Sequence, residues 1–144
     1  MNLPPKIVIG ADHAGFEYKE AIKQYLTKKN IEIIDVGTYS LDSCDYPDYA
    51  HAAAREIESG QVEYGILICG SAIGVSVTAN KHQQIRAALC WQNEIAKLSR
   101  QHNNANMICL PARFVTLDDA LEMIQTFLTT DFEGGRHQKR VEKI

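Results

Sequence analysis

The sequence predicts an α/β protein, a single doubly wound, Rossmann-like domain with a five-stranded parallel sheet and a C-terminal helix. Short apolar runs alternate with longer segments whose apolar residues recur at helical spacing, which is typical of βαβ units with parallel strands. The 144 residues contain no internal repeat, low-complexity tract or linker-like stretch. We therefore expect one domain over residues 1–144, long enough to bury a core of its own.

The expected strands are five short apolar runs. They are 6–10 (KIVIG), 31–36 (IEIIDV), 64–69 (YGILIC), 85–90 (IRAALC) and 105–110 (ANMICL). Helical spacing predicts helices over 16–29, 49–59, 75–81, 91–100 and 118–128, and a short one over 136–144 after two glycines. The longest irregular stretch, 37–48, has a length at which loops are often functional.

Composition excludes several classes of function. A net charge of −3 offers no general attraction to nucleic acid or to an anionic membrane. No apolar run approaches the roughly 20 residues of a membrane span, and the first residues lack a signal-peptide pattern. The four cysteines show neither CxxC nor zinc-ligand spacing, and three adjoin apolar runs. A reduced, cytoplasmic setting is expected.

Ligands of open parallel sheets bind beyond the carboxyl ends of the strands. This rule selects the segments that follow the expected strands. They are 12–15 (DHAG), the 37–48 loop, 69–74 (CGSAIG) and 111–113 (PAR).

The strongest local feature is CGSAIG, at the junction of a strand and a helix. Gly70 and Gly74 allow a sharp turn that exposes successive N–H groups, and the helix N-terminus favours negative charge. Such surroundings favour the thiolate of Cys69. The alternative is a packing turn with an inert core thiol.

Three other uses of this loop are disfavoured. A cysteine phosphatase needs arginine six positions after the cysteine, where Val75 stands. The loop lacks the three glycines of a dinucleotide fingerprint and the Gly-Lys-Ser/Thr of a P-loop. The expected ligand is smaller than a nucleotide.

The histidines and arginines allow two interpretations each. Asp12-His13 is either functional or an N-cap beside a solvent-facing histidine, and His102 is either functional or a polar helix end. Arg136 and Arg140 lie one turn apart and form either a phosphate clamp or a solvated basic tail. Arg113 follows a strand end directly, where a charged side chain is more often functional than a random surface charge.

No metal site is expected. His13 and His102 could share an ion, but no pair of ligands lies at helical spacing. His51, His82 and His137 have no partner spacing and are interpreted as surface residues.

Together these segments resemble the ribose-5-phosphate isomerase B family, which also includes galactose-6-phosphate and allose-6-phosphate isomerases. The resemblance covers almost the whole chain. The matching stretches are GADHAGFEYK (10–19), VGT (36–38), DYPDYA (45–50), GILICGSAIGVSVTANK (65–81), IRAA (85–88), SRQHNNAN (99–106) and EGGRHQKRVEKI (133–144).

The resemblance implies an enzyme that interconverts an aldose phosphate and its ketose through a cis-enediolate. Cys69 matches the base that moves a proton between C1 and C2, and Ser71 a hydroxyl that helps protons reach the sugar oxygens. A second branch uses a glutamate at the position of Val75, so this chain falls in the cysteine branch. His102 matches the group that opens the cyclic sugar, with Asp12 assisting.

The remaining binding positions also come from the resemblance. The amides of Gly70, Ser71, Ala72, Ile73 and Gly74 would hold the enediolate oxygen. His13, Arg113, Arg136 and Arg140 match phosphate-binding positions, Asn103 matches a hydroxyl contact, and Tyr46 would line the pocket. Ala72 departs from the family, where many members have glycine.

The family implies no metal and no organic cofactor. Its members are homodimers or dimers of dimers with shared active sites. The resemblance implies that His102, Asn103, Arg113, Arg136 and Arg140 face the partner's Cys69 and the partner's Asp12.

The sequence leaves three hypotheses for the function. The first is interconversion of D-ribose 5-phosphate and D-ribulose 5-phosphate in the non-oxidative pentose phosphate pathway. The second is isomerisation of a six-carbon sugar phosphate, allose 6-phosphate or galactose 6-phosphate. The third is a non-catalytic phosphosugar-binding module, which the presence of both Cys69 and His102 disfavours.

Overall fold

The five apolar runs form one parallel sheet, as predicted. The computed structural model of the chain describes residues 3–144. The strands are β1 (Lys6–Ala11), β2 (Glu32–Asp35), β3 (Tyr64–Cys69), β4 (Ala87–Leu89) and β5 (Met107–Pro111), in the order β2-β1-β3-β5-β4. All neighbouring strands pair in parallel, and the doubly wound α/β class is confirmed.

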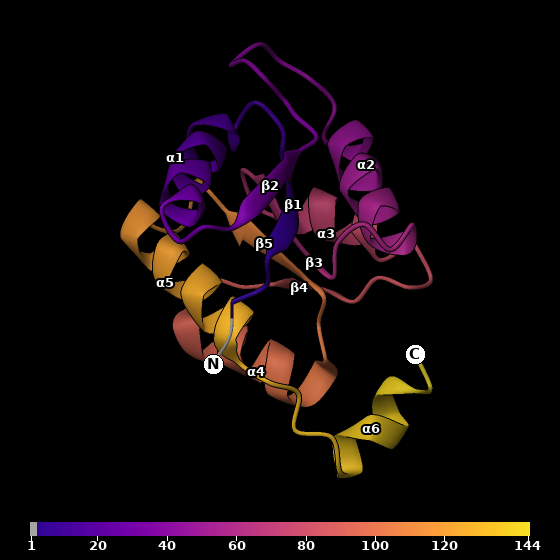
Figure 1. Cartoon of the computed structure of the whole chain (residues 1–144). Coiled ribbons are helices and arrows are strands. Elements are labelled where there is room, and N and C mark those ends of the chain that lie inside the picture. The colour runs from indigo at the N-terminus through magenta and orange to yellow at the C-terminus, as the bar shows by residue number, and fades with distance from the viewer. Residues whose placement is uncertain (1–2) are drawn as a thin grey trace.

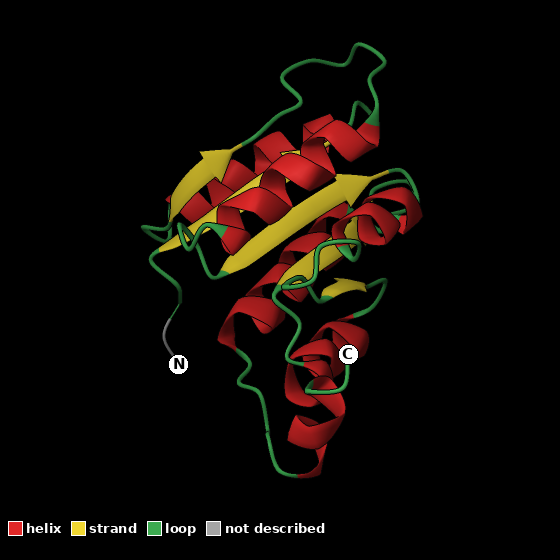
Figure 2. Cartoon of the chain, turned by 90° about the vertical axis from the view of Figure 1, so that its right-hand side faces the viewer, coloured by secondary structure: helices red, strands yellow, loops and turns green. Residues whose placement is uncertain are grey.

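Helices cover both faces of the sheet (Figures 1 and 2). The helices α1 (Phe16–Thr27), α4 (Asn93–Asn103) and α5 (Leu117–Thr129) share one buried cluster with the sheet. The helices α2 (Tyr46–Glu58) and α3 (Ile73–Ala79) share a second cluster on the opposite face. The last helix is α6 (Arg136–Val141). Burial of these two apolar faces is the main favourable contribution to folding.

The strand order places a crevice between β1 and β3. The chain leaves β1 toward β2 on one side, whereas β3 pairs with the other side of β1, so the direction of winding reverses there. Ala11 pairs with Ile68, and Cys69 pairs with Pro111. The segments that follow β1, β3 and β5 therefore begin side by side, where ligands of such sheets bind.

The helix boundaries differ from the prediction by up to three residues, and the last helix ends at Val141 instead of Ile144. Helix α2 begins at Tyr46 because Pro47 stands in its first turn, where its fixed φ suits a helix. Helix α3 begins at Ile73, directly after the turn. Helix α4 continues to Asn103, since Asn104 at φ 48° supplies the left-handed residue that ends it.

Helix α6 is set apart from the sheet (Figure 1). The Glu133 N–H donates to the Gln101 carbonyl at 3.0 Å, just before α6. The ring of His137 stacks on that of His102 at 4.2 Å between centroids. Helix α6 is thus attached to the rest of the domain through the C-terminal end of α4.

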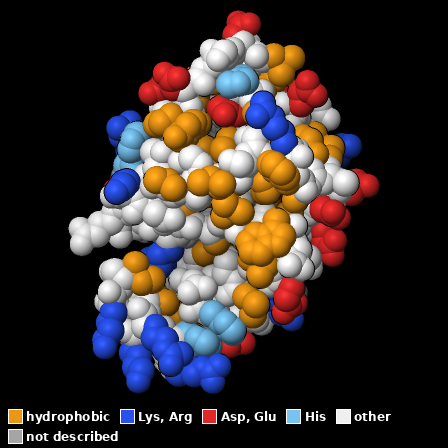
Figure 3. Space-filling model, turned by 180° about the vertical axis from the view of Figure 1, so that it is seen from behind, with side chains coloured by type: hydrophobic (Ala, Val, Ile, Leu, Met, Phe, Trp, Pro, Cys, Tyr) orange, Lys and Arg blue, Asp and Glu red, His pale blue; other side chains and the backbone are white. Residues whose placement is uncertain are grey.

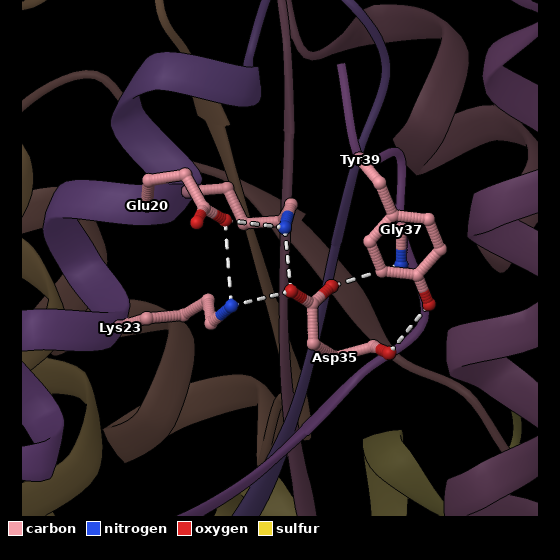
Figure 4. Close-up of polar contacts among 6 residues, drawn as sticks. Glu20, Lys23, Asp35, Gly37 and Tyr39 are labelled. Carbon is pink, nitrogen blue, oxygen red and sulfur yellow. Dashed lines mark hydrogen bonds and ion pairs between the residues drawn. The ribbon is translucent and has the colours of Figure 1, made fainter.

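A buried ion network joins α1 to β2 (Figure 4). The Lys19 side chain is fully buried, and its ammonium lies 2.6 Å from Asp35 Oδ2 and 2.8 Å from Glu20. The ammonium of Lys23 lies 2.7 Å from the same Asp35 oxygen. Buried charge persists only when it is paired in this way.

The same aspartate fixes the start of the β2–α2 loop, which covers 36–45 and not the predicted 37–48 because α2 begins at Tyr46. Asp35 Oδ1 accepts a hydrogen bond from the Gly37 N–H at 2.9 Å, and the Asp35 carbonyl accepts one from the Tyr39 hydroxyl at 3.0 Å (Figure 4). The Thr38 N–H donates to the Ala11 carbonyl at 2.7 Å. The loop is therefore held against the end of β1, beside the crevice.

Replacing Asp35 by asparagine is expected to make the free energy of unfolding depend less on pH in the acid range. Burial raises the pKa of the Asp35 carboxyl, but its bonds to Lys19, Lys23 and Gly37 outweigh burial and lower the pKa overall. The stabilisation is therefore full above about pH 4, the ordinary aspartate pKa, and is lost as pH falls through the lower folded pKa. Urea unfolding at pH 7 and pH 3 should show the variant's deficit shrinking in acid.

The control is Glu32→Gln on the same strand. Glu32 makes only an exposed pair with Lys6 at 3.9 Å, and such pairs contribute little. An Asp35→Asn deficit that is equal at both pH values would contradict the assignment.

Within residues 3–144, no helix combines the length and the apolar character needed to cross a membrane.

Candidate active site

A cavity of about 620 Å³ opens at the carboxyl ends of β1, β3 and β5. Nine of its twelve lining residues are predicted catalytic or binding residues, and Ala14, Val77 and Phe114 complete the lining. The nine are Asp12, His13, Tyr46, Cys69, Gly70, Ser71, Ile73, Gly74 and Arg113. Segments far apart in the sequence therefore converge where the topology predicts.

The turn after β1 is pressed against the end of β3. A Cβ on Gly15 would lie 2.5 Å from the Ile68 carbonyl oxygen, so only glycine allows this approach. Asp12 Oδ1 accepts hydrogen bonds from the N–H groups of Ala14 and Gly15 at 2.9 and 3.1 Å. The turn occupies one carboxylate oxygen and leaves Oδ2 for a ligand.

The β2–α2 loop (36–45) determines the tautomer of His13. The Cys44 N–H donates to His13 Nδ1 at 3.2 Å, so Nδ1 of the neutral ring carries a lone pair. The ring hydrogen of the neutral form is then on Nε2. Because His13 lines the cavity, this arrangement provides an N–H donor for an anionic ligand.

The CGSAIG turn differs from the prediction in one respect. The residue with left-handed backbone is Ala72 at φ 64°, whereas neither Gly70 nor Gly74 has positive φ. Gly74 is needed for space, since a Cβ there would lie 2.5 Å from ring atoms of Tyr46. The Ala72 side chain is buried and is not part of the cavity lining, although the sequence prediction includes it among the binding residues.

The thiol of Cys69 lies at the wall of this cavity. It is 5% exposed, at the last residue of β3. The N–H groups of Gly70, Ser71 and Ala72 find no acceptor within residues 3–144. Ser71 Oγ accepts from the Ile73 N–H at 3.3 Å, which leaves the hydroxyl hydrogen free to donate. A potential base and a row of free donors thus share one loop.

Arg113 belongs to the same half of the site. The Arg113 N–H donates to the Gly70 carbonyl at 3.1 Å, and its guanidinium packs over Gly70. The expectation that Arg113 faces the partner's Cys69 is therefore corrected, because the chain places this arginine beside its own thiol.

Four other predicted residues form a separate cluster. His102, Asn103, Arg136 and Arg140 line a cavity of about 550 Å³ with His137 and the C-terminal residues. Figure 3 shows Lys and Arg side chains gathered at this end, across a hollow from the rest of the molecule. A further cavity of about 770 Å³ adjoins it and shares Asn103 and Ile144.

The two clusters lie at opposite ends of the strands, the first at their carboxyl ends and the second near the amino end of β5. Helix α4 runs from the carboxyl end of β4 to the amino end of β5, so His102 lies near the start of β5. Met107 there pairs with Gly65, four residues before Cys69. At ~3.3 Å per residue, the four residues from Gly65 to Cys69 separate the two ends of the sheet by about 13 Å. One chain does not bring His102 to Cys69.

The structure corrects the interpretation of three histidines. His137 is buried against His102, and its Nε2 lies 3.5 Å from Glu133 Oε1, at i,i+4 spacing. Partial burial lowers the pKa of His137, and His102 and Arg136 lower it further.

The other two histidines also have partners. His51 Nδ1 and His82 Nε2 are 2.7 Å apart, and His82 Nδ1 contacts Glu58 at 2.8 Å. The Glu133–His137 spacing was readable from the sequence, whereas the His51–His82 contact joins separate elements.

Alkylation should distinguish the cysteines. Burial raises the pKa of Cys90 to about 12 and that of Cys109 well above its usual range, so both thiols stay protonated at neutral pH. Thiolate is the reactive form. Iodoacetamide at pH 8 is therefore expected to modify Cys69 and the more exposed Cys44 before the other two, as read by peptide mass spectrometry.

A phosphosugar should protect Cys69 from this reaction, and the Cys44→Ser variant should leave Cys69 as the first site. Modification of Cys109 ahead of Cys69 would contradict the proposed exposure of the cavity.

Comparison with known proteins identifies relatives of nearly the same length. A family model described as Ribose/Galactose Isomerase matches residues 7–144. Ribose-5-phosphate isomerase B of Escherichia coli (strain K12) is 45% identical over 139 residues, which are 96% of this chain and 93% of that protein. A putative sugar phosphate isomerase of Bacillus subtilis (strain 168) is 43% identical over 96% of this chain and 94% of its own.

Solved structures agree with this similarity. A ribose 5-phosphate isomerase from Thermotoga maritima superposes with a TM-score of 0.95 at 48% identity, covering 99% of this chain and 97% of that one. Ribose-5-phosphate isomerase B from Mycoplasma genitalium, solved with bound ribulose-5-phosphate, gives 0.92 at 41% identity, covering 96% and 92%.

Proposed function

The chain belongs to the ribose/galactose isomerase family, and from this premise we propose that residues 1–144 form a ribose-5-phosphate isomerase. It interconverts D-ribose 5-phosphate and D-ribulose 5-phosphate through a cis-enediolate, in the non-oxidative pentose phosphate pathway. The observation that carries the proposal is the Cys69 thiol in one cavity with Gly70 and Ser71, whose N–H groups, like that of Ala72 next in the turn, have no acceptor within residues 3–144. The relative with bound ribulose-5-phosphate supports this substrate over a six-carbon sugar phosphate.

In this mechanism Cys69 is the base. Its thiolate takes the proton from C2 of the open-chain aldose and returns it to C1, while a proton passes between the sugar oxygens with help from Ser71. The amides bind the negative oxygen of the enediolate. A positioned base contributes about 10²–10⁴-fold and one oxyanion donor about 10²–10³-fold, so neither suffices alone.

The second cluster supplies ring opening and phosphate binding. His102 exchanges a proton with the ring oxygen, assisted by Asp12, and Asn103 binds a sugar hydroxyl. The phosphate is bound by His13, with its Nε2–H donor, together with Arg113, Arg136 and Arg140. Tyr46 closes the wall beside Gly74.

These roles require two chains, so the proposed unit is a homodimer or a dimer of dimers with shared sites. The Cys69 thiol lies at the carboxyl ends of the strands, and His102 lies near the amino end of β5. Large apolar side chains are exposed beside the cavity and provide a surface for a second copy (Figure 3). They are Ile73, Val77, Trp91 and Phe114.

A cytoplasmic location fits the cysteines, since all four are unpaired and a reducing compartment keeps thiols free.

The test is a side-by-side turnover assay on ribose 5-phosphate, allose 6-phosphate and galactose 6-phosphate, with a chelator present. The expected result is turnover of ribose 5-phosphate that is unaffected by the chelator. Faster turnover of a six-carbon substrate would favour the second function. Binding of all three without turnover would favour a phosphosugar-binding module.

Replacing Arg136 by alanine is expected to raise KM with a smaller change in kcat. The phosphate is bound in the ground state and the transition state alike, so the loss falls on uniform binding. Loss of a charge-assisted hydrogen bond costs about 1.5–3 kcal/mol, or roughly 10–100-fold in KM. Lys139→Ala, on the same helix, is the matched control, and an unchanged KM for Arg136→Ala would remove this residue from the clamp.

A further inference from the structure

Three potential metal ligands converge at the junction of α4 and α6. His102 Nε2 lies 3.8 Å from Glu133 Oε1, and His137 Nε2 lies 3.5 Å from the same oxygen. The three ligand atoms all lie within 4.8 Å of one another. They come from the end of α4, the segment before α6, and α6 itself.

The two gaps to Glu133 are close to the spacing that a tetrahedral ion requires, whereas the two histidine nitrogens, within 4.8 Å of each other, must move closer together. Zinc binds imidazole nitrogen at ~2.0–2.1 Å and carboxylate oxygen at ~2.0–2.2 Å, so two ligand atoms of one tetrahedral ion stand about 3.3 Å apart. The observed gaps to Glu133 exceed this by only a few tenths of an ångström. The stacked imidazole rings must tilt so that their lone pairs converge, and rotation about side-chain bonds provides this adjustment.

We propose that His102, Glu133 and His137 form a binding site for a divalent transition-metal ion such as Zn²⁺, and that the bound ion inhibits the isomerase. The inhibition rests on the proposed function, because it acts through the ring-opening role of His102. A metal on Nε2 occupies the lone pair that must exchange a proton with the sugar. The ion is thus an inhibitor and not a cofactor.

The surrounding charges act in two directions. Arg136 and Arg140 lie on the same short helix and oppose the approach of a cation. The Glu133 carboxylate offsets part of this repulsion. Imidazole binds metal through a lone pair on a ring nitrogen, and His102 and His137 each direct Nε2 toward the Glu133 carboxylate. Two histidines and one carboxylate leave a fourth position for water, as in three-ligand zinc sites.

The other histidine group lacks this convergence and serves as the control. His82 directs one ring nitrogen to Glu58 and the other to His51, so its two contacts diverge from the ring. Within residues 3–144, the cluster of His102, Glu133 and His137 alone has three ligand atoms within reach of one ion.

The binding experiment does not depend on activity. The full chain is titrated with Co²⁺, whose visible absorption strengthens in a tetrahedral site, and with Zn²⁺ by calorimetry. One ion per chain is expected for the parent protein. His137→Ala and Glu133→Gln should each weaken binding at least about tenfold through the loss of a ligand, while His82→Ala should bind as the parent does.

Parent-like affinity in both His137→Ala and Glu133→Gln would overturn the site, as would loss of binding in His82→Ala or in Cys69→Ala. Circular dichroism checks that each variant is folded, and Glu133→Gln keeps the test decisive if His137→Ala is not.

The activity experiment tests the inhibition. Zn²⁺ should inhibit turnover of ribose 5-phosphate by the parent, and a chelator should restore it. Glu133→Gln should need at least about tenfold more Zn²⁺ for the same inhibition. Equal inhibition of parent and variant would show that Zn²⁺ acts elsewhere, for example on the Cys69 thiolate. Absence of turnover without metal would count against the proposed function and leave the binding result standing.

Discussion

Replacing Cys69 by alanine is expected to lower kcat for ribose 5-phosphate by about 10²–10⁴-fold, the usual contribution of a positioned base. The variant should still bind the sugar phosphate, because the groups proposed for the phosphate are unchanged. It should also fold, since only one sulfur atom is removed from a residue at the rim of the cavity. Steady-state kinetics, ligand calorimetry and thermal unfolding measure the three quantities.

The matched control is Cys109→Ala. Cys109 lies on the neighbouring strand β5, is fully buried, and has a pKa raised well above its usual range. The Cys109→Ala variant should keep most of the parent turnover even if it is less stable. Exchange of the substrate C2 hydrogen with solvent deuterium provides a second readout, which Cys69→Ala should abolish. Turnover of Cys69→Ala near the parent rate would refute the base assignment.

The fold was predictable because its signals are local and agree with one another. The apolar runs of β1, β3 and β5 are almost wholly buried, and their residues match the expected strands to within two positions. The shortest strand, β4, is the least well predicted, since it covers only Ala87–Leu89 of the expected 85–90. It is an edge strand that pairs only with β5, and this pairing covers just Ala87–Leu89.

The turn at Cys69 shows what a motif alone leaves undetermined. The glycines indicated a sharp turn, and the structure has one, but its left-handed residue is Ala72. A left-handed alanine costs roughly 1–2 kcal/mol, which the surrounding packing must offset. Gly74 has a different purpose, because it admits the ring of Tyr46 from α2. Contacts between segments nearly thirty residues apart carry no signal in a single sequence.

The burial of Lys19 was equally hidden. Lysine is rarely buried unless it is paired, yet the Lys19 side chain has no exposed surface. The decisive partner is Asp35 on β2, which the sequence shows only as the polar end of an apolar run. The pair holds the loop whose Cys44 N–H orients His13. A residue outside the cavity therefore supports a group inside it.

Because Cys69 and His102 lie at opposite ends of the strands, variants of these two residues are expected to complement each other. Cys69→Ala and His102→Ala proteins should each be nearly inactive alone, because each lacks one essential group in every site. Mixed under conditions that allow subunits to exchange, they should regain activity. In a mixed dimer one site has both defects, and the other combines the partner's intact Cys69 with an intact His102.

The fraction of activity that returns follows from the number of mixed dimers and of intact sites in each. Random pairing of equal amounts makes half of the dimers mixed, and each mixed dimer holds one intact site of two, so about a quarter of the parent activity should return. If His102 instead served the thiol of its own chain, the mixed dimer would contain one defect in each site and no activity would return. A mixture of Cys69→Ala with Ser71→Ala is the control, because both residues line the same cavity of one chain. It should stay near the activity of its separate components, since no pairing of these chains restores a complete site.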